Sequence, residues 1–190
     1  MTGRTSQSRP RTSPASIALI RGINVGKAKR VAMADLKKLF EGLGLTDVRT
    51  LLNSGNVVFH GTTKGDAAAL IEAAMTKKLG VSARVMVVDA AEVSAMMLAN
   101  PFSKVAKDPS RMLLGVLGSA ADARKLAPLA KHDWSPEQLA VGKRAAYLWC
   151  PEGISAGRLF LGLHKALGDG ITARNWATMT KLLALAESHA

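Results

Sequence analysis

The chain has 190 residues, which suits one ordinary domain or two small ones, and its apolar fraction of 48% is sufficient for a hydrophobic core. Its 26 Lys and Arg against 14 Asp and Glu give a net charge of +12, which favours polyanionic partners but also fits a basic soluble protein without one. The single Cys150 excludes an internal disulfide and fits a cytoplasmic protein, and no apolar run approaches the roughly 20 residues of a membrane span.

Residues 1–15 are polar, rich in Ser, Thr, Pro and Arg, and lack the apolar segment of a secretory signal. We expect a disordered basic tail here, with a transit peptide as the alternative. The three arginines of the tail explain only part of the charge, because residues 16–190 still carry a net charge of +9.

Turn residues and apolar spacing predict six segments, counting a hairpin as one, before a polar connector at 100–110. They are a strand, a helix, a hairpin of two strands, a helix, a strand and a short helix. The hairpin surrounds Asn53-Ser54-Gly55-Asn56, and Asp66 is expected to cap the second helix. The predicted ranges are 17–20, 33–43, 48–52 with 57–59, a helix from Asp66 to Gly80, 83–88, and a helix containing Val93, Met96 and Met97.

The same order of elements returns after the connector, although the two parts share few identical residues. Ser155 and Asn175 are the expected caps of the last two helices. The predicted ranges are 112–117, 120–130, 138–141 with 145–150, a helix containing Leu159, Leu163 and Leu167, a strand at 171–173, and a final helix from Asn175.

The repeated order predicts an α+β fold of two tandem ferredoxin-like (βαββαβ) halves, each an antiparallel sheet with helices packed on one face. We place the halves at 16–99 and 111–190, with 100–110 as the linker. In this topology the first two strands are parallel and the third lies antiparallel between them. The basic loop at 21–30 and the hairpin tip at 53–56 should therefore meet at one end of the first sheet.

Several short motifs between Ile17 and Ala186 together resemble a bacterial family named domain of unknown function 1697 (DUF1697). The resemblance implies a duplicated ferredoxin-like fold and no established activity, catalytic residue or cofactor. Family members often have a second glycine where this loop reads Gly26-Lys27-Ala28-Lys29, which implies a stiffer backbone here than in those members. The motifs are Arg21-Gly22-Ile23-Asn24-Val25-Gly26, Met33-Ala34-Asp35-Leu36, Asp47-Val48-Arg49-Thr50, Asn53-Ser54-Gly55-Asn56-Val57-Val58-Phe59, Asn100-Pro101-Phe102 and Arg174-Asn175-Trp176.

The glycines of the basic loop do not form a P-loop. Only three residues separate Gly22 from Gly26, and Ala28 stands where a P-loop needs a hydroxyl for magnesium. Two interpretations stay open: a looser phosphate nest beside Lys27, Lys29 and Arg30, or a solvated loop that only connects strand to helix.

Each of the other candidate motifs also has a structural interpretation. Asn53, Ser54 and Asn56 either form a simple turn or offer polar groups to an anion held by Arg21 and Lys27. No base is placed to activate Ser54 as a nucleophile. Arg174 either supports the last helix or binds an anion at its N-terminus.

Tyr147 and Trp149 alternate along a predicted strand that follows Lys143 and Arg144. They either stack nucleic-acid bases on an open sheet face or are buried between two sheets that pack face to face. Val57 and Phe59 take the comparable positions of the first half.

We predict a non-catalytic protein that binds a polyanion, most simply nucleic acid, through the loop and the hairpin tip. The alternatives are an enzyme or sensor for a small phosphorylated metabolite and a protein-interaction module. No catalytic residue, cofactor or metal ligand is assigned, since one Cys and four scattered His lack metal-ligand spacing. The candidate binding residues are Arg21, Asn24, Lys27, Lys29, Arg30, Asn53, Ser54, Asn56, Lys143, Arg144 and Arg174.

Overall fold

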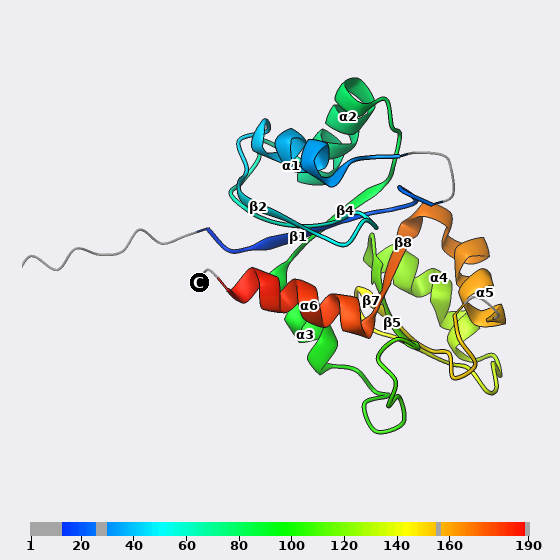
Figure 1. Ribbon diagram of the computed structural model, residues 1–190. Helices are drawn as coiled ribbons and strands as arrows, with labels where there is room; N and C mark the ends of the chain where they lie inside the picture. The colour runs from blue at the N-terminus through cyan, green and yellow to red at the C-terminus, as the bar shows by residue number, and fades with distance from the viewer. Residues whose placement is uncertain (1–12, 26–29, 155–156, 189–190) are drawn as a thin grey trace, which may run out of the picture.

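Two four-stranded antiparallel sheets organise the protein (Figure 1). We describe residues 13–25, 30–154 and 157–188 of a computed structural model. The first sheet has the strand order β2-β3-β1-β4, and β3 lies antiparallel between β1 and β2, as expected. Its elements are β1 (Ser16–Ile20), α1 (Met33–Glu41), β2 (Thr46–Leu51), β3 (Asn56–His60), α2 (Ala67–Leu79) and β4 (Val85–Asp89).

The second sheet repeats this order as β6-β7-β5-β8, so the prediction of two tandem ferredoxin-like halves is confirmed. Helices α1 and α2 cover one face of the first sheet, and α4 and α5 cover one face of the second. The remaining elements are α3 (Ala90–Leu98), β5 (Met112–Leu117), α4 (Ala120–Ala130), β6 (Gln138–Val141), β7 (Ala145–Trp149), α5 (Arg158–Leu167), a 3₁₀ turn (Gly168–Gly170), β8 (Ile171–Asn175) and α6 (Trp176–Glu187).

The uninterrupted apolar run of β1 reflects burial on both faces of the strand. Ala18 and Ile20 pack under α1 and α2, whereas Ile17 and Leu19 point into a second core that the two halves share. Successive side chains of a strand point to opposite faces, so a strand covered on both sides needs no polar alternation.

The shared core lies between the inner faces of the two sheets, where α3 and α6 also pack (Figure 1). Tyr147 is only 4% exposed in this core, and its hydroxyl donates to the Met96 carbonyl at 2.8 Å. Trp149 packs at the edge of the same core, so the burial interpretation of these aromatics is correct. The predicted equivalence with Val57 and Phe59 is wrong, because those two residues face α1 and α2.

Local capping explains several element ends. The Asp66 carboxylate accepts from the amides of Ala68 and Ala69, and Asn175 Oδ1 accepts from Thr178 N, so both predicted caps are confirmed. Gly80 ends α2 at φ +66°. The N-cap of α5 is Gly157, and Ser155 lies outside the described residues. No helix in the described ranges is both long and apolar enough to cross a membrane.

Candidate anion-binding site

The loop after β1 and the tip of the β2–β3 hairpin meet, as the topology predicts. Ile20 N donates to the Gly55 carbonyl at 2.7 Å, and Asn24 Nδ2 donates to the Asn53 carbonyl at 2.8 Å. Gly55 has φ +76°, and a Cβ there would lie 2.9 Å from both Cβ and the carbonyl oxygen of Ile20. This close approach requires glycine at the tip.

The Asn24 side chain stabilises the loop through hydrogen bonds and does not point at a ligand. Its backbone is left-handed at φ +57°, a conformation that Asn tolerates better than most residues. Its Oδ1 accepts from Val31 N at 2.8 Å, and its Nδ2 donates to the Val31 carbonyl at 2.9 Å as well as to Asn53. The side chain therefore closes the loop between residues 24 and 31 with all of its polar atoms engaged.

Arg174 on β8 joins the second half to this junction. Its Nε donates to Asn56 Oδ1 at 2.6 Å, and its Nη2 donates to the carbonyls of Ile20 and Ser54 at 2.8 and 3.0 Å. Its Nη1 donates to the Ala173 carbonyl at 2.9 Å. Four of the five guanidinium N–H groups are thus used, which leaves one on Nη1.

The charge of Arg174 is buried without a carboxylate. Burial lowers the pKa of its guanidinium to about 10, and none of the described acidic residues forms an ion pair with it. Asn56 is fully buried, and its Nδ2 donates to the Leu51 carbonyl at 3.0 Å and to Ser54 Oγ at 2.9 Å. Only neutral oxygens therefore stabilise this cation.

Arg21 ties the end of β1 to α5 and the 3₁₀ turn. Its Nη2 donates to His164 Nδ1 at 2.9 Å, its Nη1 donates to the Gly168 carbonyl, and Asp169 Oδ1 lies 3.3 Å away. Because the arginine must donate, His164 Nδ1 acts as the acceptor. Desolvation and then the charge of Arg21 lower the pKa of His164. The neutral imidazole is therefore favoured near neutral pH.

Arg21 and Arg174 line a cavity of about 360 Å³ between the loop and the second half, which we call the α5–β8 groove. Phe160 and His164 form one side in an edge-to-face contact, with ring centroids 4.3 Å apart. Thr172 Oγ1 is buried there and has no hydrogen-bond partner among the described residues. The lining contains no carboxylate. It consists of Arg21, Gly22, Val25, Phe160, His164, Ile171, Thr172, Ala173 and Arg174.

The remaining predicted residues do not all gather at this groove. Arg30 is exposed, and Lys27 and Lys29 lie outside the described residues. Lys143 is exposed on the other hairpin, and Arg144 pairs with both oxygens of Glu92 at 3.0 Å. Arg144 lines a different cavity between the halves.

Sequence reasoning missed Phe160 and His164. Their i, i+4 spacing, off the Leu159, Leu163 and Leu167 stripe of α5, is the signal that could have found them. No group of His, Cys, Asp or Glu within the described ranges could hold a metal ion.

Comparisons with known proteins place the fold and the family but no activity. The family model "Protein of unknown function (DUF1697)" matches residues 14–147. A solved structure of conserved bacterial protein SP0830 from Streptococcus pneumoniae has a TM-score of 0.75 at 24% identity, covering 92% of this chain and 99% of that chain. This likeness concerns the fold alone. No curated protein matches.

Proposed function

Because the chain belongs to the DUF1697 family, whose function is unknown, we propose from the geometry that it binds a phosphate-bearing polyanion in the α5–β8 groove. Single-stranded nucleic acid is the leading candidate. The observation that carries the proposal is a groove lined by Arg21 and Arg174 and by no carboxylate among the described residues, in which the Arg174 guanidinium contacts only neutral oxygens.

One Nη1–H of Arg174 and one Nη2–H of Arg21 have no partner among the described residues. They suit phosphate oxygens, which accept hydrogen bonds from guanidinium groups strongly. Phe160 and Val25 add apolar surface, against which a base could pack. The chain leaves the groove at Val25 and enters the segment that carries Lys27, Lys29 and Arg30. Positive charge next to stacking surface is the combination that single-stranded nucleic acid requires.

The test is fluorescence anisotropy with labelled single-stranded RNA and DNA of about 12 nucleotides, a length within the usual site sizes. If about four phosphates are contacted, the affinity should fall about 50-fold between 50 and 200 mM salt. Arg21 and Arg174 also hold the fold together, so exposed cations make better probes.

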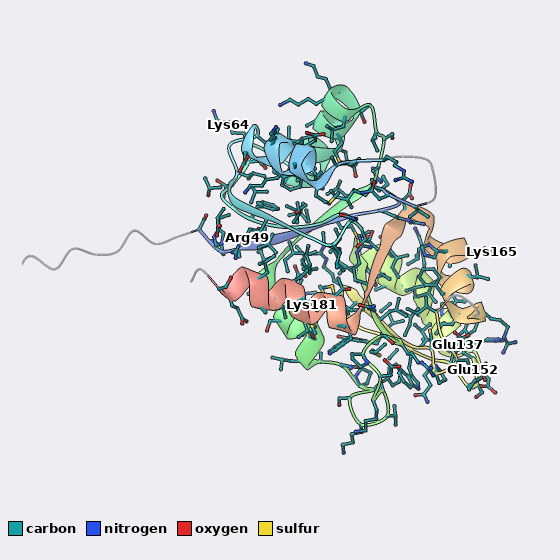
Figure 2. The ribbon with its side chains drawn as sticks, viewed as in Figure 1. Arg49, Lys64, Glu137, Glu152, Lys165 and Lys181 are labelled. Carbon is teal, nitrogen blue, oxygen red and sulfur yellow. The ribbon has the colours of Figure 1, made fainter. Side chains whose placement is uncertain are left out.

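The double variant Arg30→Ala/Lys165→Ala removes two exposed charges, one of them on α5, and should weaken binding at least tenfold. The matched control Lys64→Ala/Lys181→Ala removes equal charge from other surfaces (Figure 2) and should change affinity less than twofold. Equal losses in the two variants, or no binding at low salt, would overturn the proposal.

The second candidate is a small phosphorylated metabolite, which the groove volume of about 360 Å³ favours. This candidate predicts saturable thermal stabilisation by one phosphorylated compound. The stabilisation should persist at high salt, and oligonucleotides should not bind. The same variants then report on that compound.

A further inference from the structure

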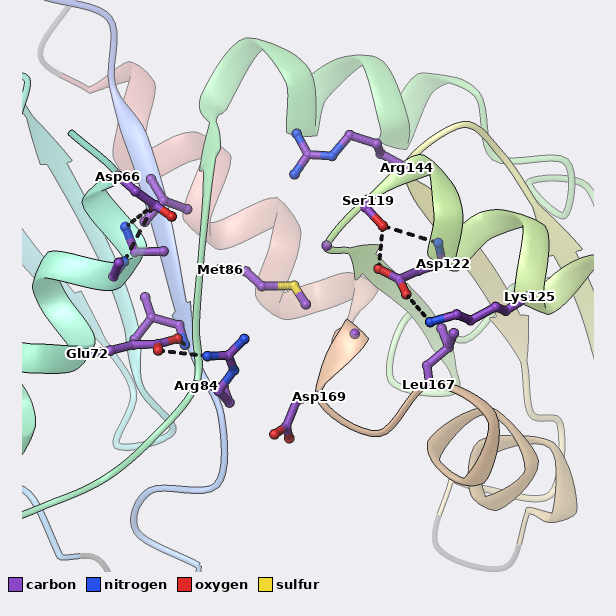
Figure 3. A pocket seen from close by; sticks show the side chains of 16 residues that line it. Asp66, Glu72, Arg84, Met86, Ser119, Asp122, Lys125, Arg144, Leu167 and Asp169 are labelled. Atoms are coloured by element: carbon purple, nitrogen blue, oxygen red, sulfur yellow. Dashed lines mark hydrogen bonds and ion pairs between the residues drawn. The ribbon is translucent and has the colours of Figure 1, made fainter.

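A larger cavity lies elsewhere, between α2 and β4 of the first half and α4 and the 3₁₀ turn of the second. We call this space of about 610 Å³ the inter-half cleft. Figure 3 shows Glu72 and Arg84 on one wall, Asp122 and Lys125 on the other, and Met86 between them. Its volume lies within the range of about 300–1,000 Å³ that small-ligand sites occupy.

One side of the cleft is the open edge of the first sheet, because β4 is the terminal strand. Ile20 is the pairing partner of Val85 and donates its N–H to the hairpin, on the side away from β4. Val85 therefore directs its backbone groups outward, and its N–H donates to Glu72 Oε1 at 2.8 Å. Since this direction alternates along a strand, the N–H and C=O of Val87 also point outward.

Apart from the Val85 N–H, these outward groups have no partner among the described residues. Among the described residues, none accepts from Val87 N or donates to the carbonyls of Val85 and Val87. Both valines line the cleft. The cleft therefore presents one donor and two acceptors in strand geometry, a short template for another extended chain.

The cleft also carries both signs of charge. Glu72 pairs with Arg84 at 2.9 Å, and Asp122 pairs with Lys125 at 3.2 Å, so each of these pairs stays within one wall and leaves the space between the walls open. In the same view, Arg144 lies towards one end and Asp169 towards the other (Figure 3). Mixed charge suits a ligand with a cation and an anion better than a polyanion, which four carboxylates would repel. The charged lining residues are Asp66, Glu72, Asp122 and Asp169 against Arg84, Lys125 and Arg144.

We propose that the inter-half cleft binds a short peptide with free termini, which lies extended as an added strand on β4. Main-chain hydrogen bonds to Val85 and Val87 provide the affinity, as in other cases of strand addition. The terminal ammonium and carboxylate meet the carboxylates and cations of the cleft. At about 3.3 Å per residue, a peptide of three or four residues spans the open edge and its charged surroundings.

The test is a titration of ¹⁵N-labelled protein with a mixture of tripeptides of random sequence, followed through the amide signals of Val87, Gly118 and Gly170. The free mixture should shift these signals saturably at millimolar total concentration. A mixture methylated at the central amide should bind at least tenfold more weakly, because it cannot pair with β4. A mixture with acetylated and amidated termini should bind at least fivefold more weakly, because it lacks both charges.

Two variants test the pairing with β4 and the charge contact separately. Val87→Pro removes an outward N–H, which an edge strand tolerates, and replaces a half-buried side chain that packs against the core of the first half. It should reduce the affinity at least tenfold. Arg84→Met should weaken the free mixture at least fivefold without affecting the capped one, whereas Lys104→Met, an exposed control away from the cleft, should change neither. No shift from the free mixture, or equal binding of the methylated mixture, would refute the proposal. Single amino acids that reproduce the shifts would also refute it.

Discussion

The two asparagines of the hairpin tip should differ sharply in their effect on stability. Asn56 is fully buried and Asn53 is exposed, although only two residues separate them. Replacing Asn56 by Ala leaves Arg174 Nε without its acceptor and removes the donor to the Leu51 carbonyl. Replacing Asn53 by Ala keeps its carbonyl, which is the group that Asn24 uses.

The magnitude follows from these contacts. A buried charged donor that loses its acceptor costs about 1.5–3 kcal/mol, and the half-buried Leu51 carbonyl adds about 1 kcal/mol. Asn56→Ala should therefore lower the free energy of unfolding by about 3 kcal/mol. For a protein of this size that corresponds to a fall in Tm of about 6–12 °C. Asn53→Ala should stay within about 0.5 kcal/mol.

Urea unfolding followed by circular dichroism measures both variants, and an unchanged dependence on urea would show that only stability has changed. If Asn53→Ala and Asn56→Ala destabilise the protein equally, or if Asn56→Ala costs less than about 1 kcal/mol, the buried network does not hold the junction. The motif would then be free for the ligand contact that its polar groups also allow.

Three further outcomes follow from the same region and from the core that α4 and α5 cover in the second half. Gly55→Ala should cost roughly 2–4 kcal/mol in urea unfolding, because the new Cβ meets Ile20 at 2.9 Å in a left-handed backbone. The pKa of His164 is lowered in the folded state, so the unfolded state binds more protons and stability should fall as pH drops below about 6.5. In the His164→Gln variant, the urea midpoint should depend less on pH across that range. Burial raises the pKa of Cys150 to about 12, so a thiol reagent at neutral pH should label this residue only as fast as the protein unfolds.

The fold could be predicted because its signals are local. Asp66 and Asn175 cap their helices with side chains that reach only two or three residues along the chain. The repeated order of predicted strands and helices indicated a ferredoxin-like topology, which gave the strand order within each half. The meeting of the loop and the hairpin tip then followed from topology alone, without any residue-specific contact.

The polar network at the junction could not be predicted in the same way. Arg174 and Asn56 are 118 positions apart, and nothing in either neighbourhood specifies the other as its partner. A buried amide and a helix-start arginine each have many possible partners, and only the packing of the two halves selects one. His164 was missed for the same reason, since its partner Arg21 lies 143 positions away.

The motifs that carry the resemblance to the family come from both halves, and three of them meet in the structure. Asn24 and the hairpin tip come from the first half, and Arg174 reaches them from the second. A change at Asn24, Asn56 or Arg174 leaves a polar group of another residue without its partner. Such residues hold the two halves in one arrangement and can contribute to binding only through the few N–H groups that remain free. A choice between ligands must therefore come from the surrounding exposed positions, which is why Arg30 and Lys165, which do not themselves line the α5–β8 groove, are the informative substitutions.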